Sequence, residues 1–198
     1  MKTILQILVV VGIIYFVCIN NTHTSDIDVK QEIVDENDYS KLKNNTFYIK
    51  GLGNVSPSVL KKIANTIERF YGFTTIIDNS IGISEDLYIK NTTEILDATI
   101  SLEKLDNPKI KVIYVTEKQL WSLGDYVNGL AYQDGNTVIV STQAHNLIET
   151  VKHEIGHTFG LSHCSEITCV MASRNDRYET GEFCEKCKKN FKNKFNLK

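Results

Sequence analysis

Hydrophobic residues recur along the chain at two spacings, and the shorter spacing predicts strands. Apolar runs at residues 47–49, 73–77 and 110–115 are rich in β-branched and aromatic residues, which is typical of strands. The third run is apolar at almost every position, so we expect its strand to be buried on both faces. Two more runs, at 129–132 and 137–140, flank Asp134-Gly135, and this arrangement predicts a β-hairpin.

Helices are predicted where apolar residues fall every three or four positions between residues that start or stop a helix. The first begins at Ser56-Pro57 and ends at Gly72. Thr92 or Thr93 is expected to cap a second helix, and Thr116 a short third one. The apolar residues assigned to these helices are Val59, Leu60, Ile63, Ala64, Ile67 and Phe70; Ile95, Leu96, Ile100 and Leu105; and Leu120 and Trp121.

The composition of the first 44 residues differs from that of the rest. Residues 1–19 start with Lys2 and are then almost entirely apolar, which predicts a signal peptide or an N-terminal membrane anchor. A lipidated Cys18 and a buried helix of the domain are the alternatives. Residues 20–44 are acidic and hold few large apolar side chains, so we expect a flexible tether. Residues 45–198 then form the folded domain, exported or membrane-anchored and facing outside the cytoplasm.

The length of 198 residues, the hydrophobic content of 42% and the net charge of −2 suit one globular domain with its own core. The near-neutral charge gives no reason to expect a nucleic-acid partner. The basic segment at 184–198 is expected to be a solvated helix face with Phe191 and Phe195 docked on the domain. We expect a monomer.

The chemistry of the chain is concentrated in the eleven residues from His153 to His163, which read H-E-x-x-H-x-x-G-x-x-H. On a helix, His153 and His157 point from one face and can share a zinc ion, while Glu154 can take a proton from a water molecule. Gly160 lets the chain reverse after the helix, so that His163 can return as a third ligand. Three histidines leave one position open, as in a catalytic zinc site.

The alternative is a charged helix with three incidental histidines. Against it, the chain has only five histidines, and three of them occupy the positions of this pattern. Apolar residues also recur every four positions on the opposite side of the same helix, at Leu147, Val151, Ile155 and Phe159, which predicts a core-facing stripe.

Four of the five cysteines, Cys164, Cys169, Cys184 and Cys187, lie in the last 35 residues in two close pairs. Such pairs can form a zinc site or two disulfides. Export favours disulfides, whereas the close spacing within each pair suits four thiolates around one tetrahedral ion. We favour zinc.

The whole pattern, H-E-x-x-H-x-x-G-x-x-H-C-x4-C-x-M and then C-x-x-C, resembles the archaemetzincin family of zinc metallopeptidases. The resemblance implies a catalytic zinc on His153, His157 and His163 with Glu154 as general base. It also implies Met171 in a turn beneath the metal, although an ordinary core methionine is the alternative. A second, structural zinc on the four cysteines is implied as well. The fold it implies is α/β (α+β), a metzincin-like mixed twisted sheet packed on an active-site helix, with a zinc-stapled C-terminal segment.

Twelve residues separate Met171 from Cys184, fewer than is usual in the family, which predicts a trimmed loop beside the substrate cleft. The predicted function is hydrolysis of a peptide or protein by a zinc-activated water, with two zinc ions per chain. A zinc-binding protein with little hydrolytic activity is one alternative, and a cell-surface hydrolase of a non-protein substrate is the other. Arg174 and Tyr178 are candidates for stabilising the oxyanion, because they follow Met171.

Overall fold

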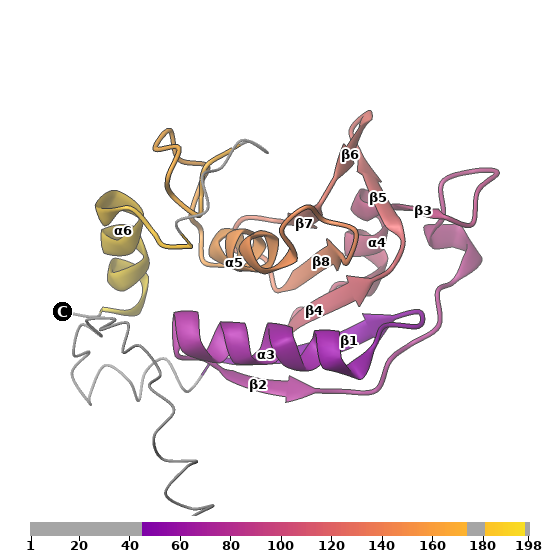
Figure 1. Ribbon diagram of the computed structural model, residues 1–198, viewed down its shortest axis with the longest axis horizontal. Helices are drawn as coiled ribbons and strands as arrows, with labels where there is room; N and C mark the ends of the chain where they lie inside the picture. The colour runs from indigo at the N-terminus through magenta and orange to yellow at the C-terminus, as the bar shows by residue number, and fades with distance from the viewer. Residues whose placement is uncertain (1–44, 174–180, 197–198) are drawn as a thin grey trace, which may run out of the picture. The chain divides into compact units, whose positions relative to one another are not determined.

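A mixed five-stranded sheet forms the centre of the computed structural model, which describes residues 45–173 and 181–196 (Figure 1). The strands lie in the order β2-β1-β4-β8-β7, and every neighbouring pair is parallel except β8 and β7. Their bounds are Thr46–Leu52 (β1), Thr74–Ile77 (β2), Lys111–Thr116 (β4), Thr137–Ser141 (β8) and Gly129–Ala131 (β7). The predicted α/β class, the three predicted strands and the predicted hairpin are confirmed.

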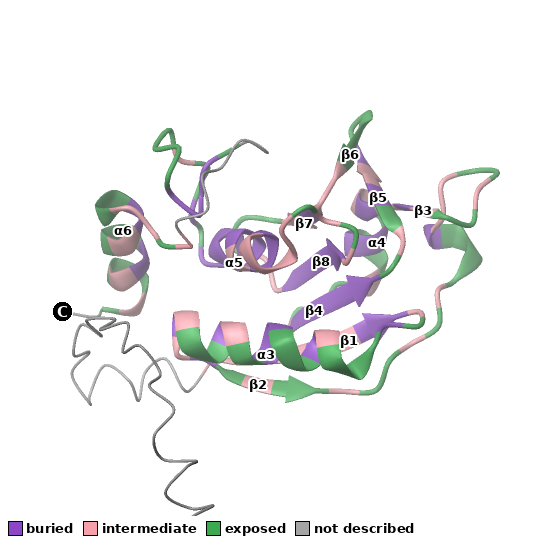
Figure 2. Ribbon diagram, in the orientation of Figure 1, coloured by how far each residue is buried: buried purple, intermediate pink, exposed green. Residues whose placement is uncertain are grey.

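Strands β4 and β8 are buried along almost their whole length, because apolar clusters cover both faces of the sheet (Figure 2). Side chains of β4 alternate between two cores: Ile113 and Val115 belong to one apolar cluster, and Val112 and Tyr114 to the other. This alternation follows from the two-residue repeat of a strand. The sheet therefore separates two cores, and each core is covered by different helices.

Helices α3 (Pro57–Tyr71) and α5 (Leu147–Thr158) pack on the first core. The limits of α3 match the prediction: Ser56 precedes it, Pro57 is its first residue, and Gly72 ends it with a left-handed φ of 71°. Tyr71 joins the two helices, because its buried hydroxyl donates to the carbonyl of Lys152 at 2.5 Å.

The second core is covered by helix α4 (Ala98–Leu105) and a small sheet of β3 (Ile95–Asp97), β5 (Gln119–Ser122) and β6 (Asp125–Val127). A short 3₁₀ helix, η1 (Glu85–Leu87), precedes β3.

The predicted helix from Thr92 is wrong in its first part. Residues Ile95–Asp97 form β3, which pairs in parallel with β5, and the helix begins only at Ala98. The true cap is Asp97, whose carboxylate accepts the N–H of Ile100 at 3.0 Å. Pairing with a distant strand overrode the local helical spacing here.

The predicted short helix from Thr116 is also wrong, because Leu120 and Trp121 lie in strand β5. β5 turns into β6 through Leu123 and Gly124, which have φ values of 50° and 94°. A leucine in the left-handed region costs about 1–2 kcal/mol, because its Cβ crowds the following carbonyl oxygen.

Helix α6 (Glu185–Phe195) docks through the two phenylalanines predicted to do so. Phe191 lies 5.4 Å from the ring of Tyr71, and Phe195 lies 5.1 Å from that of Phe159. Together with Phe73 and Phe183, these rings form one aromatic cluster between α3, α5 and α6.

The predicted signal or anchor at 1–19 and the predicted tether at 20–44 lie outside the described residues. Within the described ranges, the structure contains no helix that combines the length and the hydrophobicity needed to cross a membrane.

Lys111, at the start of β4, reaches the C-terminal end of α5. Its Nζ donates to the carbonyl oxygens of Gly135 at 3.0 Å and Thr158 at 3.2 Å, and lies 4.5 Å from the centre of the Phe159 ring. Burial, with a smaller effect from Lys194, lowers the pKa of Lys111 from 10.5 to about 8.

Replacing Lys111 with Met should therefore change how stability depends on pH. Between the folded pKa of about 8 and the unfolded value near 10.5, the unfolded chain binds more protons than the folded chain. The cost of burying the charge is present below this window and disappears as pH rises through it, so stability from this group increases with pH. Urea unfolding should show that the free energy of unfolding of wild type rises relative to that of Lys111→Met between pH values of about 8 and 10.5. A constant difference would contradict the lowered pKa.

Candidate metal centres

One face of helix α5 (Leu147–Thr158) packs on the core, and another face carries the two histidines and Glu154. Asn146 caps the helix by accepting the N–H of Glu149 at 3.2 Å. The predicted stripe of Leu147, Val151, Ile155 and Phe159 packs into the first core, with Leu147 only partly buried. His153, Glu154 and His157 lie elsewhere on the helix and line a cavity of about 830 Å³ together with His163, here named the histidine cavity.

The end of α5 brings His163 back, as predicted. Gly160 has a φ of 79°, and its N–H donates to the carbonyl of His157 at 2.8 Å. The next N–H, of Leu161, donates to the carbonyl of Gly156 at 3.1 Å. This pair of bonds is a Schellman motif, which requires a left-handed residue where Gly160 stands. The chain reverses here and returns His163 to the other two histidines.

Hydrogen bonds at Nδ1 fix the orientation of the first two histidines. Nδ1 of His153 lies 2.8 Å from the carbonyl oxygen of Val170, and Nδ1 of His157 lies 2.7 Å from that of Leu161. A carbonyl oxygen only accepts, so each Nδ1 carries the proton. Each Nε2 then presents a lone pair, which is the tautomer that a metal needs.

The distances within this group fit one ion. The two Nε2 atoms of His153 and His157 are 3.1 Å apart. Two ligands at roughly 2.0–2.1 Å from a tetrahedral zinc lie about 3.3 Å from each other. One ligand atom from each of the three histidines lies within 4.8 Å of the others. The donor set therefore suits zinc, with His163 as the exposed member of the three.

Glu154 is buried beside the histidines because a glycine in β7 makes room for it. A Cβ on Gly129 would lie 2.9 Å from Cγ of Glu154 and 3.0 Å from the carbonyl oxygen of Ile139. The sequence analysis did not find this role of Gly129. The signal was a glycine within an apolar strand, which often marks a close approach of neighbouring atoms.

Met171 is fully buried in a turn beneath the histidines. The turn closes through the N–H of Ala172 and the carbonyl of Cys169, and its Val170 carbonyl is the partner of His153. A Cβ on Gly156 would lie 2.4 Å from Sδ of Met171, so this helix glycine is what allows the turn to approach α5. Sequence reasoning had found Met171 but not Gly156 or the Val170 carbonyl.

The four predicted cysteines also converge, with all four Sγ atoms within 4.8 Å of one another. Sγ of Cys164 and Cys184 are 3.7 Å apart, too far for a disulfide and close to the spacing of about 3.8 Å between two thiolates on a tetrahedral zinc. Backbone N–H groups of Met171 and Cys184 donate to Sγ of Cys169 at 3.4 and 3.3 Å. Such bonds stabilise thiolates, so this cluster fits a metal as well.

The thiols differ in acidity within this cluster. Burial raises the pKa of Cys169 and that of Cys187. Burial also opposes ionisation of Cys184, but its pKa is lowered overall by a hydrogen bond from the backbone of Cys187 and by the neighbouring thiols. Four thiolates this close repel one another, and a divalent cation among them removes that cost.

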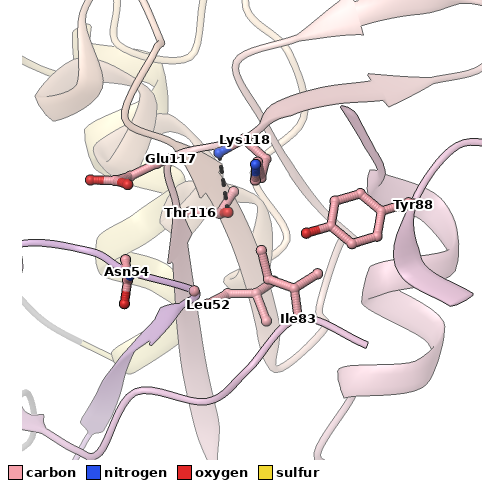
Figure 3. Close-up of a pocket in the computed structure, with 8 residues that line it drawn as sticks. Leu52, Asn54, Ile83, Tyr88, Thr116, Glu117 and Lys118 are labelled. Atoms are coloured by element: carbon pink, nitrogen blue, oxygen red, sulfur yellow. Dashed lines mark hydrogen bonds between the residues drawn. The ribbon is translucent and has the colours of Figure 1, made fainter. Parts of the chain in front are cut away.

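A second cavity of about 390 Å³ lies where β1 and β4 end (Figure 3). Leu52 and Thr116 are the paired last residues of these strands, and open α/β sheets often bind ligands at such an edge. Lys118, the cation of this cavity, pairs with Glu94 at 3.0 Å. None of the described residues that line it is a histidine or a cysteine. The candidate zinc ligands therefore lie in the histidine cavity and the cysteine cluster instead.

Comparison with known proteins identifies the family of this chain. The family model described as Peptidase family M54 matches residues 35–193. An archaemetzincin from Pyrobaculum aerophilum is 32% identical over 102 residues, covering 45% of this chain and 66% of that protein. One from Methanopyrus kandleri is 23% identical over 147 residues, covering 66% of this chain and 84% of that protein.

Solved structures show the same fold. The crystal structure of archaemetzincin from Methanopyrus kandleri matches with a TM-score of 0.65 at 20% identity, covering 77% of this chain and 96% of that one. The structure from Archaeoglobus fulgidus, complexed with malonate, gives a TM-score of 0.63 at 26% identity, covering 73% and 99%. The predicted metzincin-like fold is confirmed.

The prediction of an exported or membrane-anchored protein is wrong. The relatives that match are archaemetzincins, and no described helix spans a membrane. The prediction rested on Lys2 followed by the apolar run of residues 4–19, which is shorter than the roughly 20 residues that a spanning helix needs. That run, and the oxyanion candidates Arg174 and Tyr178, lie outside the described residues.

Replacing Gly156 with Ala should destabilise the protein although alanine favours helices. The new Cβ would lie 2.4 Å from Sδ of the fully buried Met171, so the turn beneath the histidines must shift. Overpacking of this kind costs about 1–3 kcal/mol. Thermal unfolding should show a lower midpoint for Gly156→Ala. Gly82→Ala is the control, because a Cβ there has no neighbour within 4 Å. Equal midpoints for the two variants would show that Met171 does not depend on this glycine.

Proposed function

The chain belongs to peptidase family M54, and from this premise we propose how its residues divide the work of a zinc metallopeptidase. Membership rests on the match over residues 35–193. The enzyme is a hydrolase of peptide bonds. In our proposal, residues 45–198 form the peptidase domain, and His153, His157 and His163 hold the catalytic zinc.

The observation that carries this proposal is the orientation of the two helix histidines. Both Nδ1 atoms are bonded to carbonyl oxygens, and both Nε2 atoms face each other at 3.1 Å. When bound there, zinc would polarise the scissile carbonyl and lower the pKa of a water molecule toward ~7. His153 and His157 therefore already have the tautomer that a zinc ligand needs.

Glu154 acts as the general base in this proposal. Its side chain is buried, follows the first histidine directly and lines the same cavity. The backbone of Gly129 lies close against it, because a Cβ on Gly129 would be only 2.9 Å from Cγ of Glu154. A carboxylate held in this way can accept the proton of the attacking water and pass it to the departing amine.

The substrate is a peptide in extended form. β7 is the last strand of the large sheet, and all three of its residues line the histidine cavity. An extended peptide can add to such an edge through main-chain hydrogen bonds, which position it without requiring a particular side chain. Its scissile bond would then lie beside the histidines and Glu154.

Cys164, Cys169, Cys184 and Cys187 hold a second, structural zinc in this proposal. Cys164 directly follows His163, and its N–H donates to the carbonyl of Met171 at 2.7 Å. Cys184 and Cys187 belong to the start of α6. The second ion would therefore fix both the turn beneath the histidines and the C-terminal helix.

Replacing Glu154 with Gln should lower peptide hydrolysis by roughly 10²–10⁴-fold and leave the zinc content unchanged, because the amide cannot accept the proton and the residue is not a ligand. Cleavage of a quenched fluorescent peptide and metal analysis of the same sample measure the two quantities. Undiminished hydrolysis would place the base elsewhere. If wild type binds zinc and cleaves none of a broad set of peptides, the protein is instead a zinc-binding protein with little activity.

Metal analysis should give two zinc ions per chain for wild type and one for Cys187→Ser, because three thiolates and a hydroxyl bind zinc much more weakly than four thiolates. Cys18→Ser is the control, since Cys18 is the one cysteine outside the cluster, and it should retain two ions. Cys187→Ser should also unfold at a lower temperature. One zinc in wild type, with the four cysteines recovered as disulfides, would disprove the structural site.

A further inference from the structure

The hairpin of β5 and β6 exposes an apolar tip that the fold does not require. Leu123, at the turn, is 98% exposed, and Tyr126 on β6 is 55% exposed. Figure 2 shows the tip of this hairpin in the colour of exposed residues. Trp121 lies opposite Tyr126 in the register, with their rings 5.0 Å apart and nearly perpendicular. We name Trp121, Leu123 and Tyr126 the hairpin tip.

Leucine at position 123 serves neither the turn nor the core. A two-residue turn with positive φ at both positions, here 50° and 94°, is suited to Asn-Gly or Asp-Gly. Leu123 therefore occupies a backbone conformation that leucine disfavours, and it buries almost none of its own side chain. A strained and exposed leucine in the same hairpin as two packed aromatic rings forms an apolar surface suited to contact with something outside the fold.

The hairpin tip is continuous with the histidine cavity. Tyr126 and Val127 line that cavity, and β6 runs through Asn128 directly into β7, the edge strand. Figure 1 shows the hairpin projecting from the body of the protein on the side of β7 and α5. A chain leaving the cavity past Tyr126 would meet Leu123 next.

We infer that the hairpin tip is a recognition surface for substrate, selecting extended polypeptides with a large apolar side chain beyond the residues held at the metal. This inference rests on the proposed peptidase function and adds the substrate class. Leucine and two aromatic rings offer non-directional apolar contact, which favours aliphatic and aromatic side chains over charged ones.

The position of that side chain follows from the length of the hairpin. Two residues, Gly124 and Asp125, lie between Leu123 and Tyr126, and the turn at Leu123 and Gly124 is about two strand positions, or about 7 Å, beyond Tyr126 in the cavity wall. An extended substrate covers the same distance in about two residues. The selected residue therefore lies two positions beyond the residue in contact with Tyr126 and three to five positions from the scissile bond, on the side of the hairpin, and short peptides do not reach it.

Leu123→Asn is the sharpest test, because asparagine suits this turn better than leucine. The variant should unfold at the same or a higher temperature than wild type. Its kcat/KM should fall about tenfold for peptides that carry Leu three to five residues from the scissile bond on either side. It should be unchanged for the same peptides with Ser there, and for a short peptide that lacks those positions.

Ile77→Thr is the matched control, since Ile77 is 46% exposed on β2, at the opposite end of the sheet order from β7. It should not change the preference for Leu over Ser. An equal preference in wild type, or a preference that survives Leu123→Asn, would overturn the inference.

A binding measurement separates this inference from the proposed function. Trp121 is the only tryptophan in the chain, so intrinsic fluorescence reports on the hairpin tip itself. In Glu154→Gln, the Leu-bearing long peptide should shift Trp121 emission to shorter wavelength, and the Ser-bearing peptide should not. Loss of that shift in Glu154→Gln/Leu123→Asn supports the recognition surface even if hydrolysis has not been detected. Identical spectra with both peptides would overturn it even in an active peptidase.

Discussion

The hydrogen bond from Nδ1 of His153 to the carbonyl of Val170 is the interaction on which the rest of the site depends. It fixes the tautomer of His153, and it also fixes the position of the Met171 turn relative to helix α5. That turn can come so close to α5 only because Gly156 has no side chain, since a Cβ there would meet the Met171 sulfur at 2.4 Å. A helix glycine, which on its own lowers helix stability, is thus what brings the metal ligands and their support together.

The C-terminal helix is joined to this arrangement by two different kinds of contact. Cys184 and Cys187 bring the start of α6 to the cysteine cluster, while Phe191 and Phe195 pack on the aromatic cluster that includes Phe159. Phe159 is the last residue of the apolar stripe of α5, directly before the glycine that turns the chain toward His163. The segment from Phe159 to Cys164 is therefore held at one end by the packing of Phe159 and at the other by the cysteine cluster. Both contacts limit how far His163 can move.

Sequence alone predicted the strands of the large sheet, α3, the hairpin, and every histidine and cysteine that the structure brings together. These succeed because their signals are local: a helical spacing of four, a glycine with left-handed φ at a helix end, or a run of β-branched residues. The failures at Ile95–Asp97 and Leu120–Trp121 have one cause, because those residues pair with each other in parallel and nothing local reveals the partner. Gly129, Gly156 and the Val170 carbonyl were missed for a similar reason, since each acts by the approach of a distant segment.

The two candidate metal centres are not independent, because they share the segment from Leu161 to Met171. The Leu161 carbonyl orients His157, the N–H of Cys164 binds the Met171 carbonyl, and the N–H of Met171 binds Sγ of Cys169. Ordering this segment costs conformational entropy once, whichever ion arrives first. If both proposed sites hold zinc, the ion that binds second would meet ligands already positioned and would bind more tightly. Filling the cysteine cluster should therefore favour zinc at the histidines without any contact between the two ions, because Cys164 directly follows His163 in the chain.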